Sequence, residues 1–173
     1  MVFLVISKDL NVEIIIVDDS TNNHIESYIV KNANSKIIYK KNQPQKGAVN
    51  NWNFGLKLAR GRYVTLLHHD EYYLDSHNQL QNLLKKNQNK YDILVSRINN
   101  VRPDGTIYQL KLNNYLKNTV LNFFPSFLFL YNFIGPVSCI VFKNNSKVVL
   151  FNHNMKWLVD VEWYQRLFKR KKV

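Results

Sequence analysis

Two apolar runs that end in polar side chains constrain the fold of this chain more than any other feature. Residues 12–18 read VEIIIVD, and residues 62–67 read RYVTLL and are followed by HHDE. A run that is apolar at every position is typical of a strand buried on both faces, as in a sheet covered by helices on each side. We therefore expect both segments to be central strands.

Segments with helical periodicity separate the apolar runs. Helices are predicted over 23–32, 47–60, 75–87 and 159–169, and further strands over 36–40, 91–97 and 137–142. Strands alternating with helices are typical of an α/β fold with a mostly parallel sheet flanked by helices. Pro103, Asp104 and Gly105 predict a turn.

Length and composition favour one folded domain over residues 1–173. Hydrophobic residues make up 46% of the chain, enough for a core, and charged residues only 21%. Cys139 is the single cysteine, which excludes an intramolecular disulfide framework and a cysteine zinc cluster. A reducing, cytoplasmic location is the default expectation for such a chain.

The net charge of +12 has two compatible interpretations. It reflects a sequence rich in Lys, Asn and Ile, or it indicates an anionic partner such as a nucleotide, a nucleic acid or a lipid surface.

No segment is a convincing membrane span. The best candidate, residues 120–134, is shorter than the roughly 20 apolar residues that a spanning helix needs, and Pro125 interrupts it. Its aromatic part, 123–133, either packs a helix into the fold or, with the basic tail 169–172, rests on an anionic membrane surface.

Both polar clusters follow strands, and ligands of open α/β sheets sit beyond the carboxyl ends of strands. Asp18 and Asp19 either cap a turn or accept hydrogen bonds from the base or ribose of a nucleotide. The cluster 68–71 either starts a solvated loop or holds a divalent metal. Carboxylates suit Mg²⁺ or Mn²⁺, and the imidazoles favour Mn²⁺.

A third group of candidates opens the last predicted helix. Asp160 either favours the helix N-terminus electrostatically or is a general base at the rim of a pocket. Glu162 lies four residues before Arg166, a spacing that predicts an ion pair on the helix surface.

Taken in order, these segments resemble the family 2 glycosyltransferases of the GT-A fold. The resemblance is carried by four segments: VEIIIVDDSTNN, NWNFGLKLARGRYVTLLHHDE, IGPVSCIVFK and KWLVDVEWYQRL. It covers nearly the whole chain, with a nucleotide-binding part over about 1–100 and an acceptor-side part over about 101–173.

The resemblance implies an inverting transfer of sugar from a nucleotide-diphospho-sugar to a glycan or lipid-linked acceptor, in polysaccharide or cell-envelope biosynthesis. It implies Mn²⁺ or Mg²⁺ at Asp70, with His68 in the place of the first Asp of the usual DxD motif. Asp160 takes the place of the catalytic base. The nucleotide-binding positions are Asp18, Asp19, Asn53 and His69. The implied location is cytoplasmic, with peripheral contact on the inner face of the membrane, and no nucleic acid is expected.

The chain also departs from the family pattern at both ends. Residues 1–8 are expected to lie inside the helix that follows the family's first strand, so that central strand is expected to be missing. The chain stops soon after the helix that carries Asp160. We therefore expect a domain truncated at both ends, with unpaired neighbours where the first strand belongs.

Two other functions compete with this interpretation. A receiver-like signalling domain would use Asp18, Asp19 and Asp70, with Lys111 or Lys117 as its lysine, but would leave Asp160 without a role. A basic nucleic-acid-binding module fits the charge, but the sequence has neither a recognition-helix nor a stacking-sheet motif.

Overall fold

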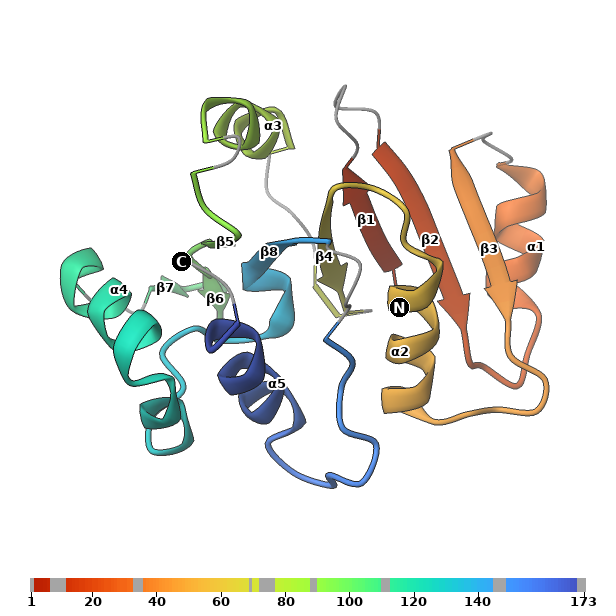
Figure 1. Ribbon diagram of the computed structural model, residues 1–173. Coiled ribbons are helices and arrows are strands. Elements are labelled where there is room, and N and C mark those ends of the chain that lie inside the picture. The colour runs from red at the N-terminus through yellow and green to blue at the C-terminus, as the bar shows by residue number, and fades with distance from the viewer. Residues whose placement is uncertain are drawn as a thin grey trace.

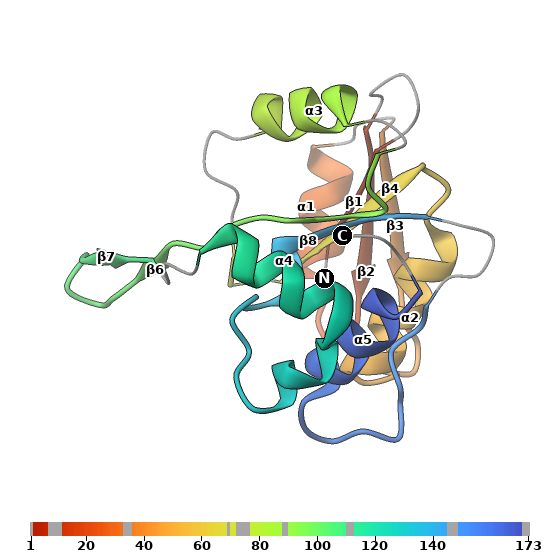
Figure 2. The ribbon, with the colours of Figure 1, turned by 60° about the vertical axis from the view of Figure 1, so that its left-hand side comes forward.

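The computed structural model describes residues 2–6, 12–32, 36–68, 70–71, 77–87, 90–109, 113–144 and 149–170. A six-stranded sheet has the order β3-β2-β1-β4-β8-β5. Its strands are β1 (Val2–Ile6), β2 (Val12–Asp18), β3 (Ile37–Lys41), β4 (Tyr63–Leu67), β5 (Ile93–Val95) and β8 (Ile140–Lys143). Helices cover both faces of this sheet (Figures 1 and 2), which confirms the predicted α/β class.

The expectation of a mostly parallel sheet is wrong, because most neighbouring strands of this sheet pair antiparallel. Only β2 and β3 pair in parallel, whereas β1 pairs antiparallel with β2 and β4, and β8 pairs antiparallel with β4 and β5. It follows that β2, β3, β4 and β5 all run in one direction, and that β1 and β8 are reversed between them. The carboxyl ends of β2 and β4 therefore still meet at one edge of the sheet.

The expectation that the central strand is missing is also wrong. Residues 2–6 do not lie in a helix but form β1, which pairs Phe3 with Ile15 on one side and with Leu66 on the other. Only residues 7–11 connect β1 to β2. A parallel connection needs a crossover of a dozen residues or more, so a neighbouring strand reached through five residues has to be antiparallel.

Two pairs of helices lie on opposite faces of the sheet. On one face lie α2 (Ala48–Leu58) and α5 (Val159–Phe168), which both contribute to the main core, and α1 (His24–Lys31) lies on the other face beside β3 (Figures 1 and 2). Leu84 of α3 (His77–Lys86) packs with Tyr63 and Val141 on that second face. Gly47 is the N-cap residue that precedes α2, and its φ of 77° lies in the left-handed region that suits glycine.

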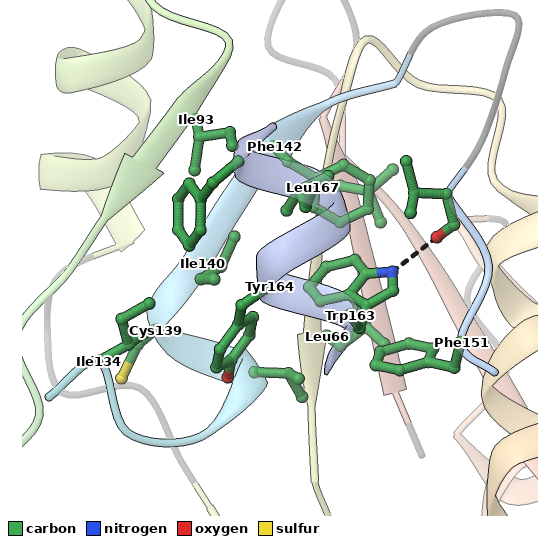
Figure 3. Packing of buried hydrophobic residues seen from close by; sticks show 14 of the residues in the cluster. Leu66, Ile93, Ile134, Cys139, Ile140, Phe142, Phe151, Trp163, Tyr164 and Leu167 are labelled. Carbon is green, nitrogen blue, oxygen red and sulfur yellow. Dashed lines mark hydrogen bonds between the residues drawn. The ribbon is translucent and has the colours of Figure 1, made fainter. Parts of the chain in front are cut away.

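Trp163 of α5 is the centre of the main core (Figure 3). Its ring stacks on Phe151 at 4.6 Å and meets Phe142 edge-on at 5.3 Å, and its indole N–H donates to the Val149 carbonyl at 2.6 Å. The same helix also contributes the buried side chains of Val161, Tyr164 and Leu167 to this core. These contacts hold α5, and so Asp160 at its start, against the sheet.

The segment between β5 and β8 carries smaller elements. A hairpin joins β6 (Asn100–Val101) to β7 (Ile107–Tyr108) through the predicted turn, in which Gly105 has a φ of 82°. Helix α4 (Asn114–Phe123) is followed by the 3₁₀ helix η1 (Pro125–Phe129). A second 3₁₀ helix, η2 (Val137–Cys139), takes the first residues of the predicted strand 137–142. Cys139 is buried, as predicted, but in η2 instead of mid-strand.

Among the described residues, every helix is too short or too polar to cross a bilayer.

Candidate active site

The polar clusters predicted from the sequence meet at one edge of the sheet. In Figure 1 β2 and β3 end at the lower edge, and α2 and α5 begin there. Asp18 ends β2 and Asp19 follows it, residues 68–71 follow β4, and Asp160 lies in the first turn of α5. Three elements thus bring the candidate side chains to one side of the molecule.

Asp18 is a buried carboxylate with partners on both oxygens. Its Oδ1 accepts the Ser20 backbone N–H at 2.9 Å, and its Oδ2 accepts the Tyr39 hydroxyl at 2.8 Å. Burial alone would raise the pKa of Asp18, but the hydrogen bonds from Ser20 and Tyr39 and the charge of Lys41 outweigh it and lower the pKa. Asp18 therefore stays ionised and positions the end of β2.

Asp19 anchors the loop that leads into α2. Its carboxylate accepts the backbone N–H groups of Lys46 and Gly47, each at 2.9 Å, and the side-chain amide of Asn42 at 2.9 Å. The Asn42 amide also donates to Asn51 of α2 at 2.8 Å. This network ties the end of β2 to the N-terminus of α2.

The side chain of Asn53 bonds the backbone of Phe151, a residue distant in the sequence. Its amide donates to the Phe151 carbonyl at 2.9 Å and its oxygen accepts the Phe151 N–H at 2.7 Å. These bonds join positions 98 residues apart. The predicted nucleotide contact of Asn53 stays a prediction. In the structure, the amide nitrogen and oxygen of its side chain both bond the backbone of Phe151 and so join α2 to that segment.

The side chain of His68 has a buried ring nitrogen without a hydrogen-bond partner among the described residues. This nitrogen is Nε2, and the imidazole ring tilts against Trp52 with centroids 5.3 Å apart. The His68 backbone N–H donates to Glu71 at 2.9 Å. Asp70 is exposed, and His69, a predicted nucleotide contact, lies outside the described residues.

The residues near β4 fit a divalent metal in donor chemistry. An imidazole nitrogen without a partner and a solvent-facing carboxylate stand two residues apart, at His68 and Asp70. Within the described part of the chain no three His, Cys, Asp or Glu side chains gather as a ligand set. A metal here would take further ligands from a diphosphate and water, as Mg²⁺ commonly does.

Asp160 is half-buried beside a loop that sequence reasoning did not single out. The Asn132 amide lies 3.4 Å from Asp160 Oδ2 and donates to the Gly135 carbonyl at 3.2 Å. Leu158, just before the helix, has a left-handed φ of 53°, which is uncommon for a bulky residue. The predicted pair of Glu162 and Arg166 is confirmed as a two-pronged contact at 2.5 and 2.7 Å.

Tyr164 connects Asp160 electrostatically to the end of β4. Its hydroxyl donates to the Gly135 carbonyl at 3.0 Å. Burial raises the pKa of Tyr164 well above its usual value, and the charges of Asp160, Cys139 and Glu71 raise it further. The signal that points to Tyr164 in the sequence is its place one helical turn after Asp160.

A cavity of about 550 Å³ runs between α2 and the segment that precedes α5. Its walls combine cationic, amide and aromatic side chains: Lys46, Asn50, Asn53, Phe54, Lys57, Leu150, Phe151 and His153. The Lys46 ammonium lies 4.7 Å from the centre of the Phe54 ring. Of the predicted site residues, this cavity takes in Asn53 alone.

Comparison with known proteins assigns the chain to a family. The model of glycosyl transferase family 2 matches residues 4–147. The chain is similar to the UDP-Glc:alpha-D-GlcNAc-diphosphoundecaprenol beta-1,3-glucosyltransferase WfaP of Escherichia coli, with 44% identity over 64 residues, which are 37% of this chain. The match spans 26% of that relative's length. No solved structure matches the chain. Because the family model covers most of the sequence, this chain belongs to glycosyl transferase family 2, as the four sequence segments indicated.

Proposed function

We propose that this chain transfers a sugar, with inversion, from a nucleotide-diphospho-sugar to an acceptor hydroxyl on a glycan or a lipid-linked glycan. Family membership supports the glycosyltransferase activity, and the printed name of the Escherichia coli relative supports an acceptor carried on a lipid. Neither the receiver-like nor the nucleic-acid-binding alternative gains support from these matches. The observation that carries the proposal is that Asp19 after β2, Asp70 after β4 and Asp160 in the first turn of α5 lie toward one edge of the sheet.

The donor side consists of the ends of β2 and β4. Asp19 is half-buried and is our candidate for the nucleoside contact, while buried Asp18 holds Tyr39 and Ser20 in place. Asp70, with His68, would hold Mn²⁺ or Mg²⁺. Such an ion supplies positive charge that neutralises the diphosphate of the donor and of the departing nucleotide.

The acceptor side consists of Asp160 and its neighbours. An acceptor hydroxyl is a poor nucleophile until its proton leaves, and the Asp160 carboxylate takes that proton as the new bond to the sugar forms. Asp160 lies in the first turn of α5, where the positive end of the helix dipole is. Asn132 orients it through the 3.4 Å contact to Oδ2. We extend the proposal to a cytoplasmic location with peripheral contact on the inner face of the membrane.

Calorimetry with a nucleoside diphosphate tests the donor side. We expect Mn²⁺ to raise the affinity of the wild type, because the metal cancels phosphate charge that the nearby carboxylates repel. Asp70→Ala removes the ligand and is expected to abolish the Mn²⁺ effect, while Asp92→Ala, a carboxylate paired with Lys143 instead, keeps it. Equal affinities with and without Mn²⁺ in the wild type and Asp70→Ala would exclude the metal assignment.

A transfer assay tests the acceptor side. Asp160→Asn keeps the shape of the side chain but cannot accept a proton, and transfer is expected to slow by about 100-fold or more with unchanged donor affinity. Glu162→Gln is the matched control in the same helix turn, because Glu162 is engaged with Arg166. Equal losses in the two variants, or weaker donor binding in Asp160→Asn, would assign Asp160 a structural role.

A further inference from the structure

Several large apolar side chains are exposed on α4, on η1 and just before α5, and η1 packs against both helices. Leu130 is 82% exposed, Trp157 84% and Phe123 73%. Together with the neighbouring exposed residues they form a surface that we name the aromatic rim: Phe123, Phe124, Phe127, Leu130, Trp157 and Leu158. Exposed apolar groups that lie together, unlike scattered ones, mark a surface that binds a partner or a membrane.

The aromatic rim lies at the same edge as the candidate active site. Figures 1 and 2 place η1, the loop before α5 and the start of α5 at the lower end of the molecule, where β2 and β3 end. Gln165 of α5 donates to Ser126 of η1 at 2.7 Å, which holds the two parts of the rim together. Leu158 and Asp160 are two residues apart, so the rim borders the proposed base.

The charge around the rim selects one kind of partner. Residues 105–159 contain five Lys and not a single Asp or Glu, in a chain that has 12 acidic residues elsewhere. Lys156 is exposed and directly precedes Trp157. Exposed tryptophan beside lysine is the combination found where proteins meet the headgroup layer of a membrane. The net charge of +12 also suits the negative potential of a bilayer with anionic lipids.

We propose that the aromatic rim rests in the headgroup layer of an anionic bilayer, so that Asp160 faces an acceptor sugar carried on a lipid. The identity of the acceptor rests on the proposed function, whereas the membrane contact does not. The rim residues enter the interface to the depth of their side chains, and the lysines hold the chain to anionic headgroups. Reversible binding of this kind needs both contributions, since neither alone is strong.

Vesicle co-sedimentation tests the contact without reference to catalysis. The chain is expected to bind vesicles of phosphatidylglycerol and phosphatidylcholine at least about tenfold more tightly than vesicles of phosphatidylcholine alone. The triple change Phe124→Ser, Leu130→Ser and Trp157→Ser is expected to weaken binding to the anionic vesicles about tenfold or more, because it removes apolar area from the interface.

A second triple change controls for loss of surface hydrophobicity in general. Val30→Ser, Val101→Ser and Ile107→Ser remove exposed apolar side chains from α1, β6 and β7, away from the rim, and are expected to leave vesicle binding unchanged. Tryptophan fluorescence reports the contact: of the three tryptophans, Trp163 is buried and Trp52 half-buried, so a shift of the emission to shorter wavelength on anionic vesicles should come from Trp157 and be lost in the rim triple variant. Equal vesicle binding by the two triple variants would overturn the proposal, as would a rim change that only breaks self-association of the chain.

A transfer assay links the rim to the acceptor. The rim triple variant should transfer sugar at the wild-type rate to a short soluble acceptor and about tenfold more slowly to a lipid-carried acceptor in anionic vesicles. Vesicle binding without any transfer would contradict the proposed function and leave the membrane contact standing. Transfer to both acceptors at wild-type rates by the rim variant would contradict the inference and leave the proposed function standing.

Discussion

Asp18 is the residue at which burial and charge oppose each other most clearly in the described structure. It is 2% exposed, yet the hydrogen bonds from Ser20 and Tyr39 and the charge of Lys41 keep its pKa below the usual value. The carboxylate therefore contributes to the stability of the fold only while it is ionised.

The sign of the pH dependence follows from this lowered pKa. In the unfolded chain Asp18 titrates near its ordinary value of about 3.9, above its pKa in the folded state. Between these two values the unfolded chain binds more protons, so the stabilisation present above pH 4 is lost as the pH falls. Urea midpoints between pH 6 and pH 2 should fall less steeply for Asp18→Asn than for the wild type, with Tyr39→Phe in between. Identical slopes for all three would contradict a coupled Asp18.

At the scale of elements, Asn53 and Trp52 of α2 both contact Phe151 in the segment before α5. Asn53 satisfies both the N–H and the carbonyl of Phe151, and Phe151 stacks on Trp163 of α5. Helix α2 is thereby connected to the helix that carries Asp160.

Asn53→Ala separates this packing role from the predicted nucleotide contact. It leaves two backbone groups of Phe151 unpaired, and we expect the free energy of unfolding to fall by about 1–3 kcal/mol. Asn50→Ala is the control, one turn earlier on the same cavity wall; its exposed amide bonds only to Lys46, and we expect a loss within about 0.5 kcal/mol. Urea unfolding measures both variants. Nucleotide affinity that falls in Asn53→Ala at unchanged stability would instead favour direct ligand contact.

At the scale of the whole molecule, β1 holds the sheet together. It pairs with β2 on one side and with β4 on the other, and β2 and β4 carry the donor side of the site. The position that the family resemblance predicted to be empty is filled by a reversed strand.

Deletion of residues 1–6 should therefore abolish cooperative folding. The change leaves the facing N–H and C=O groups of β2 and β4 unpaired, at about 1–3 kcal/mol each when buried. A few such groups equal a domain's entire net stability of roughly 5–15 kcal/mol. Circular dichroism on heating should show a sharp transition for the full chain and a broad one for the variant lacking residues 1–6. A sharp transition at the same temperature in both would mean that β1 contributes nothing to the sheet.

The sequence alone determined those features that depend on neighbouring residues. The strand at 12–18, the turn at 103–105 and the pair of Glu162 and Arg166 are confirmed, because a continuous apolar run, a tight turn and a four-residue helical spacing are each encoded within a few positions. The family was likewise predicted from four short segments.

Only the tertiary structure decided which distant segments meet. The reversed direction of β1 follows from the short connection to β2, and the contact of Asn53 with Phe151 forms because packing brings α2 to a segment 98 residues away. The stretch 123–133 was expected either to pack into the fold or to rest on a membrane, and the structure divides it: Leu128 and Phe133 are buried, whereas Phe123, Phe124 and Leu130 are exposed. A side chain's burial depends on how many apolar positions the folded core can take up, and that number exists only once the elements have packed.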